Sequence, residues 1–217
     1  MQLIYVGDPM CSWCYGFGNI LTELTETRPD LPLKIVVGGI RAGATDILDD
    51  AGKRFRLQHW TRVEKASGLQ FNRKGFLARE GFIYDTEPIC RAVVTARAFA
   101  PGQNPLPLFC TLQRAFYMDA RDTTATDVLV EVAAGALADS GLDVSKQAFR
   151  YLFESDSVKQ ATQADFALAR SWGISSFPSL LVEDRGQLQL LAMGFTSLDI
   201  LNNRLNKVLG ERAFAAA

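Results

Sequence analysis

The sequence predicts an α/β protein in which a β-α-β unit and a β-β-α unit enclose a large all-helical insertion. Two observations support this class. Short apolar runs typical of buried strands occur near both ends of the 217-residue chain. Between them, helical patterns follow one another from about residue 45 to residue 173. We therefore expect a discontinuous sheet domain, residues 1–44 and 174–217, around an insertion domain, residues 45–173.

The first unit begins with residues 3–6, a nearly continuous apolar run typical of a strand buried on both faces. A helix is predicted next, because apolar residues repeat there at helical spacing, namely Phe17, Ile20, Leu21 and Leu24. Pro29 and Pro32 end this helix. Residues 33–37 form the second predicted strand, which a pair of glycines closes.

The middle of the chain predicts helices only. Helix-compatible spacing, caps and stop signals place them at about residues 46–66, 86–100, 105–119, 126–140, 145–153 and 157–172. Residues 68–84 contain three glycines and several basic residues, and we expect a loop there.

The last unit contains two predicted strands, residues 179–183 and 187–191, joined by a hairpin turn. Thr196 can cap a final apolar helix, and the alanine-rich end is expected to fray. The order β-α-β, insertion, β-β-α is that of a thioredoxin fold.

Composition predicts the compartment and excludes some partners. The formal net charge is −1, so we expect no general attraction to nucleic acid or to anionic membranes. The first residues lack the basic and apolar regions of a signal peptide, and no apolar run is long enough to span a bilayer. With only four cysteines, a disulfide framework is excluded, and a cytoplasmic location is expected.

Two of the cysteines, Cys11 and Cys14, lie at the turn between the first strand and the first helix. A structural metal site needs about four ligands, and a single CxxC supplies two, so we predict no metal. A permanent disulfide is disfavoured in a reducing cytoplasm. A helix N-terminus stabilises an anion, which favours a reactive thiolate at Cys11 and a more buried, resolving thiol at Cys14.

A second feature lies far along the chain, where Pro178 directly precedes a predicted core strand. A proline at this position removes a hydrogen bond from the sheet. The arrangement is explained if the bond from Phe177 to Pro178 is cis, which would leave the backbone of Phe177 free to pair with an extended substrate.

These segments resemble the DsbA-type thiol–disulfide oxidoreductases, in particular their FrnE-like cytoplasmic branch. The resemblance covers essentially the whole chain, and the motifs that carry it are DPMCSWCY at residues 8–15, DTEP at 85–88, FCTLQRAF at 109–116 and GISSFPS at 173–179. It implies a nucleophile at Cys11, a resolving thiol at Cys14 and a substrate-facing cis-proline at Pro178.

The sequence departs from this family at two places. Ser12 and Trp13 separate the cysteines, where strongly oxidising members carry Pro-His, so we expect a weaker oxidant. Phe177 stands where a small or β-branched residue is usual, which changes the expected peptide groove. We assign Ser12, Trp13, Phe177 and Pro178 to substrate binding, with Trp13 as an exposed apolar platform.

Further residues are candidates for supporting roles. Asp8 either tunes the thiols or caps the turn, Tyr15 flanks the cysteines and is expected to pack, and Arg41 follows the second strand as a loop charge or a partner for a nearby carboxylate. Cys90 and Cys110 lie on apolar helical faces and are expected to pack in the core. His59, the single histidine, is expected on a helix surface or at a domain contact.

The sequence therefore predicts a disulfide oxidoreductase or isomerase acting on protein or small-molecule disulfides. We expect no permanently bound cofactor, with electrons from glutathione or another dithiol. Two alternatives stay open: a glutathione-dependent transferase or isomerase of the kappa type, and a non-enzymatic, holdase-like binder. Both a monomer and a homodimer are compatible with the sequence.

Overall fold

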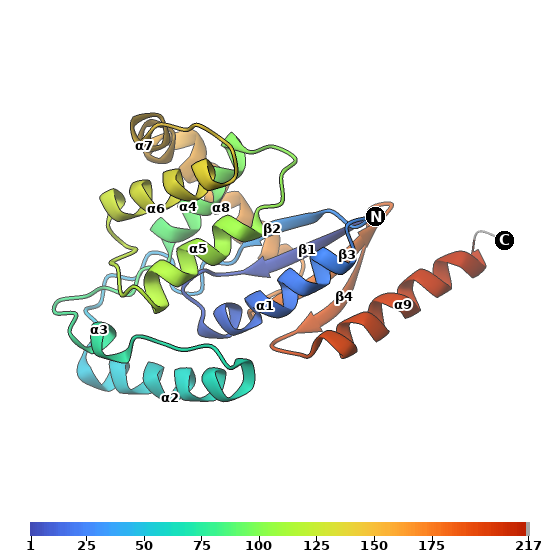
Figure 1. Ribbon diagram of the computed structural model, residues 1–217, viewed down its shortest axis with the longest axis horizontal. Coiled ribbons are helices and arrows are strands. Elements are labelled where there is room, and N and C mark those ends of the chain that lie inside the picture. The colour runs from blue at the N-terminus through green and yellow to red at the C-terminus, as the bar shows by residue number, and fades with distance from the viewer. Residues whose placement is uncertain (216–217) are drawn as a thin grey trace.

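A four-stranded mixed sheet lies at the centre of the computed structural model, which describes residues 1–215 (Figure 1). Its order is β2-β1-β3-β4, from the strands β1 (Gln2–Gly7), β2 (Leu33–Val37), β3 (Ser179–Asp184) and β4 (Gln187–Met193). β1 pairs in parallel with β2 and antiparallel with β3, and β3 pairs antiparallel with β4. Both ends of the chain thus build one sheet, as the predicted thioredoxin fold requires.

Helices cover both faces of this sheet. Tyr5 of β1 stacks on Phe17 of α1 (Ser12–Thr27), at 6.1 Å between ring centroids. Leu201 of α9 (Leu198–Ala215) is buried in the same apolar cluster. The alternate residues of β1 point to the opposite face, where Val6 clusters with Ala169 of α8 (Asp156–Ser171). The central strand is therefore buried on both sides, which explains its uninterrupted apolar run.

The remaining helices connect β2 to α8. They are α2 (Asp50–Ser67), α3 (Arg73–Leu77), α4 (Glu87–Phe99), α5 (Leu106–Tyr117), α6 (Thr126–Asp139) and α7 (Lys146–Glu154). In Figure 1, α4 to α7 form a group on one side of the sheet, and α2 and α3 lie apart from them, beside the start of α1. The N-terminal end of α1 therefore lies between the two groups.

A partly buried ion pair joins the helical region to the sheet. Arg97 of α4 bonds Asp165 of α8 at 2.8 Å, and it donates to the carbonyl of Ile35 in β2 at 2.6 Å. Asp165 also accepts from the backbone N–H of Val37, the last residue of β2. These bonds fix the end of β2, where the loop beside Cys11 begins.

The structure differs from the sequence prediction within residues 68–84. The predicted loop contains the short helix α3, which Asn72 caps by accepting from the N–H of Gly75, and an isolated β-bridge joins Ile83 to Ile47, before α2. A five-residue helix is too short to show a periodic apolar pattern. α8 packs on the sheet, although the prediction assigns it to the insertion. The division of the chain into two domains stays a prediction.

Candidate active site

Cys11 is the N-cap residue of α1 and Cys14 lies in its first turn. The preceding turn is closed by a bond from the N–H of Cys11 to the carbonyl of Asp8, at 3.0 Å. The first turn of α1 contains no acidic side chain, and no side chain caps its amides. The positive end of the helix dipole is therefore available to an anion at Cys11.

The two thiols differ in exposure. Cys11 is 7% exposed and Cys14 is fully buried, as the sequence predicts, and both are free thiols. Burial raises the pKa of Cys14 well above its ordinary value, the nearby Cys11 raises it further, and a hydrogen bond with the hydroxyl of Tyr5 opposes these effects. Cys14 is thus held as a protonated thiol beneath the more accessible Cys11.

Cys11 meets a segment that is 166 residues away in sequence. Its Sγ donates a hydrogen bond to the carbonyl oxygen of Phe177, at 3.6 Å. The bond between Phe177 and Pro178 is cis, which confirms that prediction. Pro178 itself is buried, and its carbonyl accepts from the N–H of Gly194. The group that faces the thiol is therefore the backbone of Phe177.

The ring of Phe177 fits against the glycines that end β2. A Cβ atom on Gly38 would lie 2.2 Å from this ring, and Gly39, with φ of +62°, would meet the ring of Phe166 in the same way. Only glycine leaves room for both rings here. The large residue before the cis-proline is thus accommodated by the glycine pair, which the sequence indicates only as the end of a strand.

An open cleft of about 460 Å³ lies beside Cys11. Its lining includes residues 11–13 and 175–177, together with Phe55, Arg56 and His59 of α2. Its lining contains Arg41, Arg56 and His59 and no aspartate or glutamate, and burial together with nearby arginines lowers the pKa of His59. Such a cleft favours a ligand with negative charge and an apolar part.

His59 lies partly exposed on the surface of α2, as the sequence predicts, and it also lines the cleft. Phe55, Arg56 and His59 are spaced so that they share one face of α2, and this face forms the cleft wall. The spacing was visible in the sequence, but nothing local shows that α2 folds back beside Cys11.

Asp8 is a fully buried carboxylate beneath the site. Its two oxygens accept from the N–H of Met10, at 2.8 Å, and the N–H of Ile40, at 2.7 Å. Burial raises the pKa of Asp8 to about 6, while hydrogen bonds from Thr86, Ile40, Met10 and Cys90 oppose the shift. Asp8 thus joins the CxxC turn to the loop that follows β2.

The other candidates from sequence occupy different places. Ser12 and Trp13 line the cleft. Trp13 is half-buried rather than the exposed platform that the sequence predicts, because its ring packs against Phe195, at 5.6 Å between ring centroids. Tyr15 points into an aromatic cluster and donates to the carbonyl of Gln70, away from the cleft. Arg41 lines the cleft and pairs with Asp46 at 2.7 Å.

The two remaining cysteines lie outside the cleft. Cys90 is fully buried and donates to Asp8 at 3.7 Å, and Cys110 is half-buried on α5. Within residues 1–215, no three side chains of His, Cys, Asp or Glu gather as ligands for a metal ion. In the same residues, no helix has the length and apolar character to cross a membrane.

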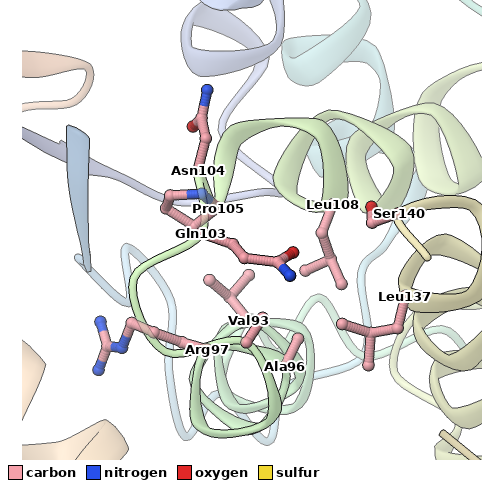
Figure 2. Close-up of a pocket in the computed structure, with 10 residues that line it drawn as sticks. Val93, Ala96, Arg97, Gln103, Asn104, Pro105, Leu108, Leu137 and Ser140 are labelled. Atoms are coloured by element: carbon pink, nitrogen blue, oxygen red, sulfur yellow. The ribbon is translucent and has the colours of Figure 1, made fainter. Parts of the chain in front are cut away.

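A second pocket lies among α4, α5 and α6, and Figure 2 shows its lining. Val93, Leu108 and Leu137 provide its apolar walls, and the volume of about 20 Å³ suits a single water molecule. The pocket contains no cysteine, so the cleft beside Cys11 is the better candidate for substrate binding.

Comparison with known proteins identifies structures that share this fold. A family model described as Thioredoxin matches residues 101–203. A solved structure named "putative protein disulfide isomerase", from Nitrosomonas europaea, is 34% identical, with a TM-score of 0.86 over 97% of this chain and 98% of that chain. No curated protein sequence gives a significant match.

More distant structures extend the similarity. The cytosolic disulfide reductase DsbM from Pseudomonas aeruginosa is 25% identical, with a TM-score of 0.76 over 96% of this chain and 98% of that one. A structure of DsbM with GSH gives a TM-score of 0.74 at the same identity, over 96% of this chain and 99% of that one. Together with the fold and the near-complete match at 34% identity, these similarities show that the chain belongs to the DsbA-like family of thiol–disulfide oxidoreductases.

Proposed function

We propose that this protein is a cytoplasmic dithiol–disulfide oxidoreductase in which Cys11 attacks the substrate disulfide and Cys14 resolves the intermediate. The observation that carries the proposal is the position of Cys11, at the N-terminus of α1 and facing the carbonyl of Phe177. A thiolate there is stabilised by the helix, and a peptide beside it can pair with the backbone of Phe177.

The reaction follows in two exchanges. The Cys11 thiolate forms a bond to one substrate sulfur, and the other sulfur leaves as a thiolate that takes up a proton. Cys14 then loses its proton and attacks the sulfur of Cys11, which releases the second substrate thiol and leaves a disulfide between the two cysteines. Two molecules of glutathione, or another dithiol, reduce this disulfide and become oxidised themselves.

The difference between the thiols supports these roles. Cys11 reaches the cleft, whereas the burial of Cys14 keeps it protonated until the mixed disulfide forms beside it. A buried thiol with a raised pKa is a poor first nucleophile. It becomes effective as a resolving group because the target sulfur lies less than one helical turn away.

We further propose glutathione disulfide, and mixed disulfides of glutathione, as substrates. Glutathione carries two carboxylates, and the cleft lining presents the guanidinium of Arg56 together with Arg41, which also pairs with Asp46. The relative DsbM has a structure with GSH, and its name describes it as cytosolic. Trp13 and Phe55 add apolar surface for the remainder of the substrate.

The test of the function is reduction of insulin and of a small aromatic disulfide. The wild-type protein should accelerate both, Cys11→Ser should lose the activity, and Cys110→Ser should retain it as the control for loss of one thiol. Wild-type rates no higher than those of Cys11→Ser would contradict the proposal.

The substrate proposal has its own test, because α2 offers a matched pair of arginines. Arg56 lines the cleft, whereas Arg54 is exposed and does not. Arg56→Gln should raise the KM for glutathione disulfide about five-fold through loss of one nearby cation, with the same change in net charge as Arg54→Gln. Equal KM values in the two variants would show that the wall of the cleft does not bind the anion.

A further inference from the structure

Two buried tyrosines converge on the backbone directly before Cys11. Tyr84, which precedes α4, and Tyr117, at the end of α5, both donate from their hydroxyls to the carbonyl of Met10, the latter at 2.5 Å. Neither tyrosine forms a hydrogen bond with Cys11 among the described residues. The sequence analysis did not single out either of them. Both come from the helical region between the two halves of the sheet domain.

The surroundings hold both rings in place. Tyr84 lies beneath the guanidinium of Arg56, at 4.4 Å, and packs edge-on against Phe116. Tyr117 stacks on Tyr15 at 4.7 Å between ring centroids. Burial raises the pKa of both Tyr84 and Tyr117 well above the ordinary value, so the two hydroxyls are protonated donors at neutral pH.

The peptide that joins Met10 to Cys11 is consequently fixed at both ends. Its oxygen accepts from the two tyrosines, and its N–H donates to the carbonyl of Asp8. The orientation of this peptide plane determines where the side chain of Cys11 lies relative to the first turn of α1.

We infer that Tyr84 and Tyr117 are positioning residues that set the reactivity of Cys11 by holding the carbonyl of Met10. A buried carbonyl without its donors turns toward other N–H groups, because leaving it unpaired costs free energy. The amides at the start of α1 have no side-chain cap, and they are the groups that stabilise a thiolate. The tyrosine hydrogen bonds therefore keep the Met10 carbonyl from pairing with these amides, which stay available to stabilise the sulfur of Cys11.

This inference rests on the proposed role of Cys11. Alkylation of Cys11 tests the positioning role of the tyrosines separately from that proposed role. The experiment measures the rate at which iodoacetamide labels Cys11 as a function of pH, read by peptide mapping, in the wild type and in Tyr84→Phe, Tyr117→Phe and the double variant. Each single variant should react about three-fold more slowly at neutral pH, and the double variant about ten-fold, with the pH profile displaced upward.

Thr162→Val is the matched control. The fully buried hydroxyl of Thr162 donates to the carbonyl of Val158 in α8, at 2.8 Å, so this variant also loses one buried hydroxyl bond but far from the CxxC turn. It should lose stability without any change in the alkylation of Cys11.

The outcomes are distinct. Tyrosine variants that are less stable but label Cys11 at the wild-type rate and pH would overturn the inference, because the tyrosines would then be purely structural. If the double variant does not fold, the two single variants decide. Wild-type Cys11 that reacts no faster than a free cysteine would instead contradict the proposed function.

Discussion

At the scale of single residues, Asp8 is the side chain whose charge state matters most to the turn that carries the cysteines. Its carboxylate bonds the N–H of Met10 on one side and the N–H of Ile40 on the other. The same carboxylate is fully buried and has no basic partner among its hydrogen bonds. Burial of the carboxyl therefore raises its pKa from 3.8 to about 6, and the hydrogen bonds from neighbouring donors offset only part of this shift.

This shift predicts how stability depends on pH. Folded Asp8 takes up a proton near pH 6 and unfolded Asp8 near pH 3.8, so between these values the folded state binds more protons. The contribution of Asp8 to the free energy of unfolding should rise as the pH falls from 7 to about 4, by up to roughly 3 kcal/mol.

Chemical denaturation at several pH values gives the free energy of unfolding of the wild type and of Asp8→Asn, and the difference between the two proteins measures that contribution. Asn cannot titrate, and its amide can accept from only one of the two N–H groups, so the variant should lack this pH dependence and be less stable at pH 5. A wild-type minus variant difference that does not change between pH 7 and pH 4 would contradict the assignment.

At the scale of elements, the site depends on how the end of β2 meets the segment before β3. Gly38 leaves the space that the ring of Phe177 fills, and this contact sets the backbone whose carbonyl faces Cys11. The bulky Phe177 before the cis-proline therefore needs a glycine opposite its ring.

Gly38→Ala should consequently displace Phe177 and lower the rate of disulfide reduction about ten-fold, because the added Cβ overlaps the ring. The double variant Gly38→Ala with Phe177→Val should recover most of the activity, since the smaller side chain restores the space. Gly135→Ala, where a Cβ would meet nothing within 4 Å, provides the control. Equal activity in Gly38→Ala and Gly135→Ala would show that the contact is not required.

At the scale of the whole molecule, the sequence predicts what local patterns determine. The apolar run of residues 3–6 and the spacing of Phe17, Leu21 and Leu24 give the strand and helix around the CxxC, because burial imposes those periods. The cis bond before Pro178 was predictable for a similar reason, since a proline directly before a core strand requires a local explanation.

The features that the sequence does not predict are contacts between segments far apart in the chain. Nothing near Met10 in sequence indicates that Tyr84 and Tyr117 bond its carbonyl, 74 and 107 residues away. Likewise, His59 became part of the cleft only because α2 folds back beside Cys11. These contacts depend on the packing of the helical region against the sheet, which periodicity in one segment cannot reveal.

The measurement that tests the central claim most directly is the trapping of a mixed disulfide. Cys14→Ser removes the resolving thiol, so incubation with glutathione disulfide should leave one glutathione attached to the protein, at Cys11, as intact mass and peptide mapping would show. The variant that lacks both Cys11 and Cys14 should gain no adduct. An adduct on Cys110, or none on Cys14→Ser, would contradict the account, because Cys11 would then not be the attacking group.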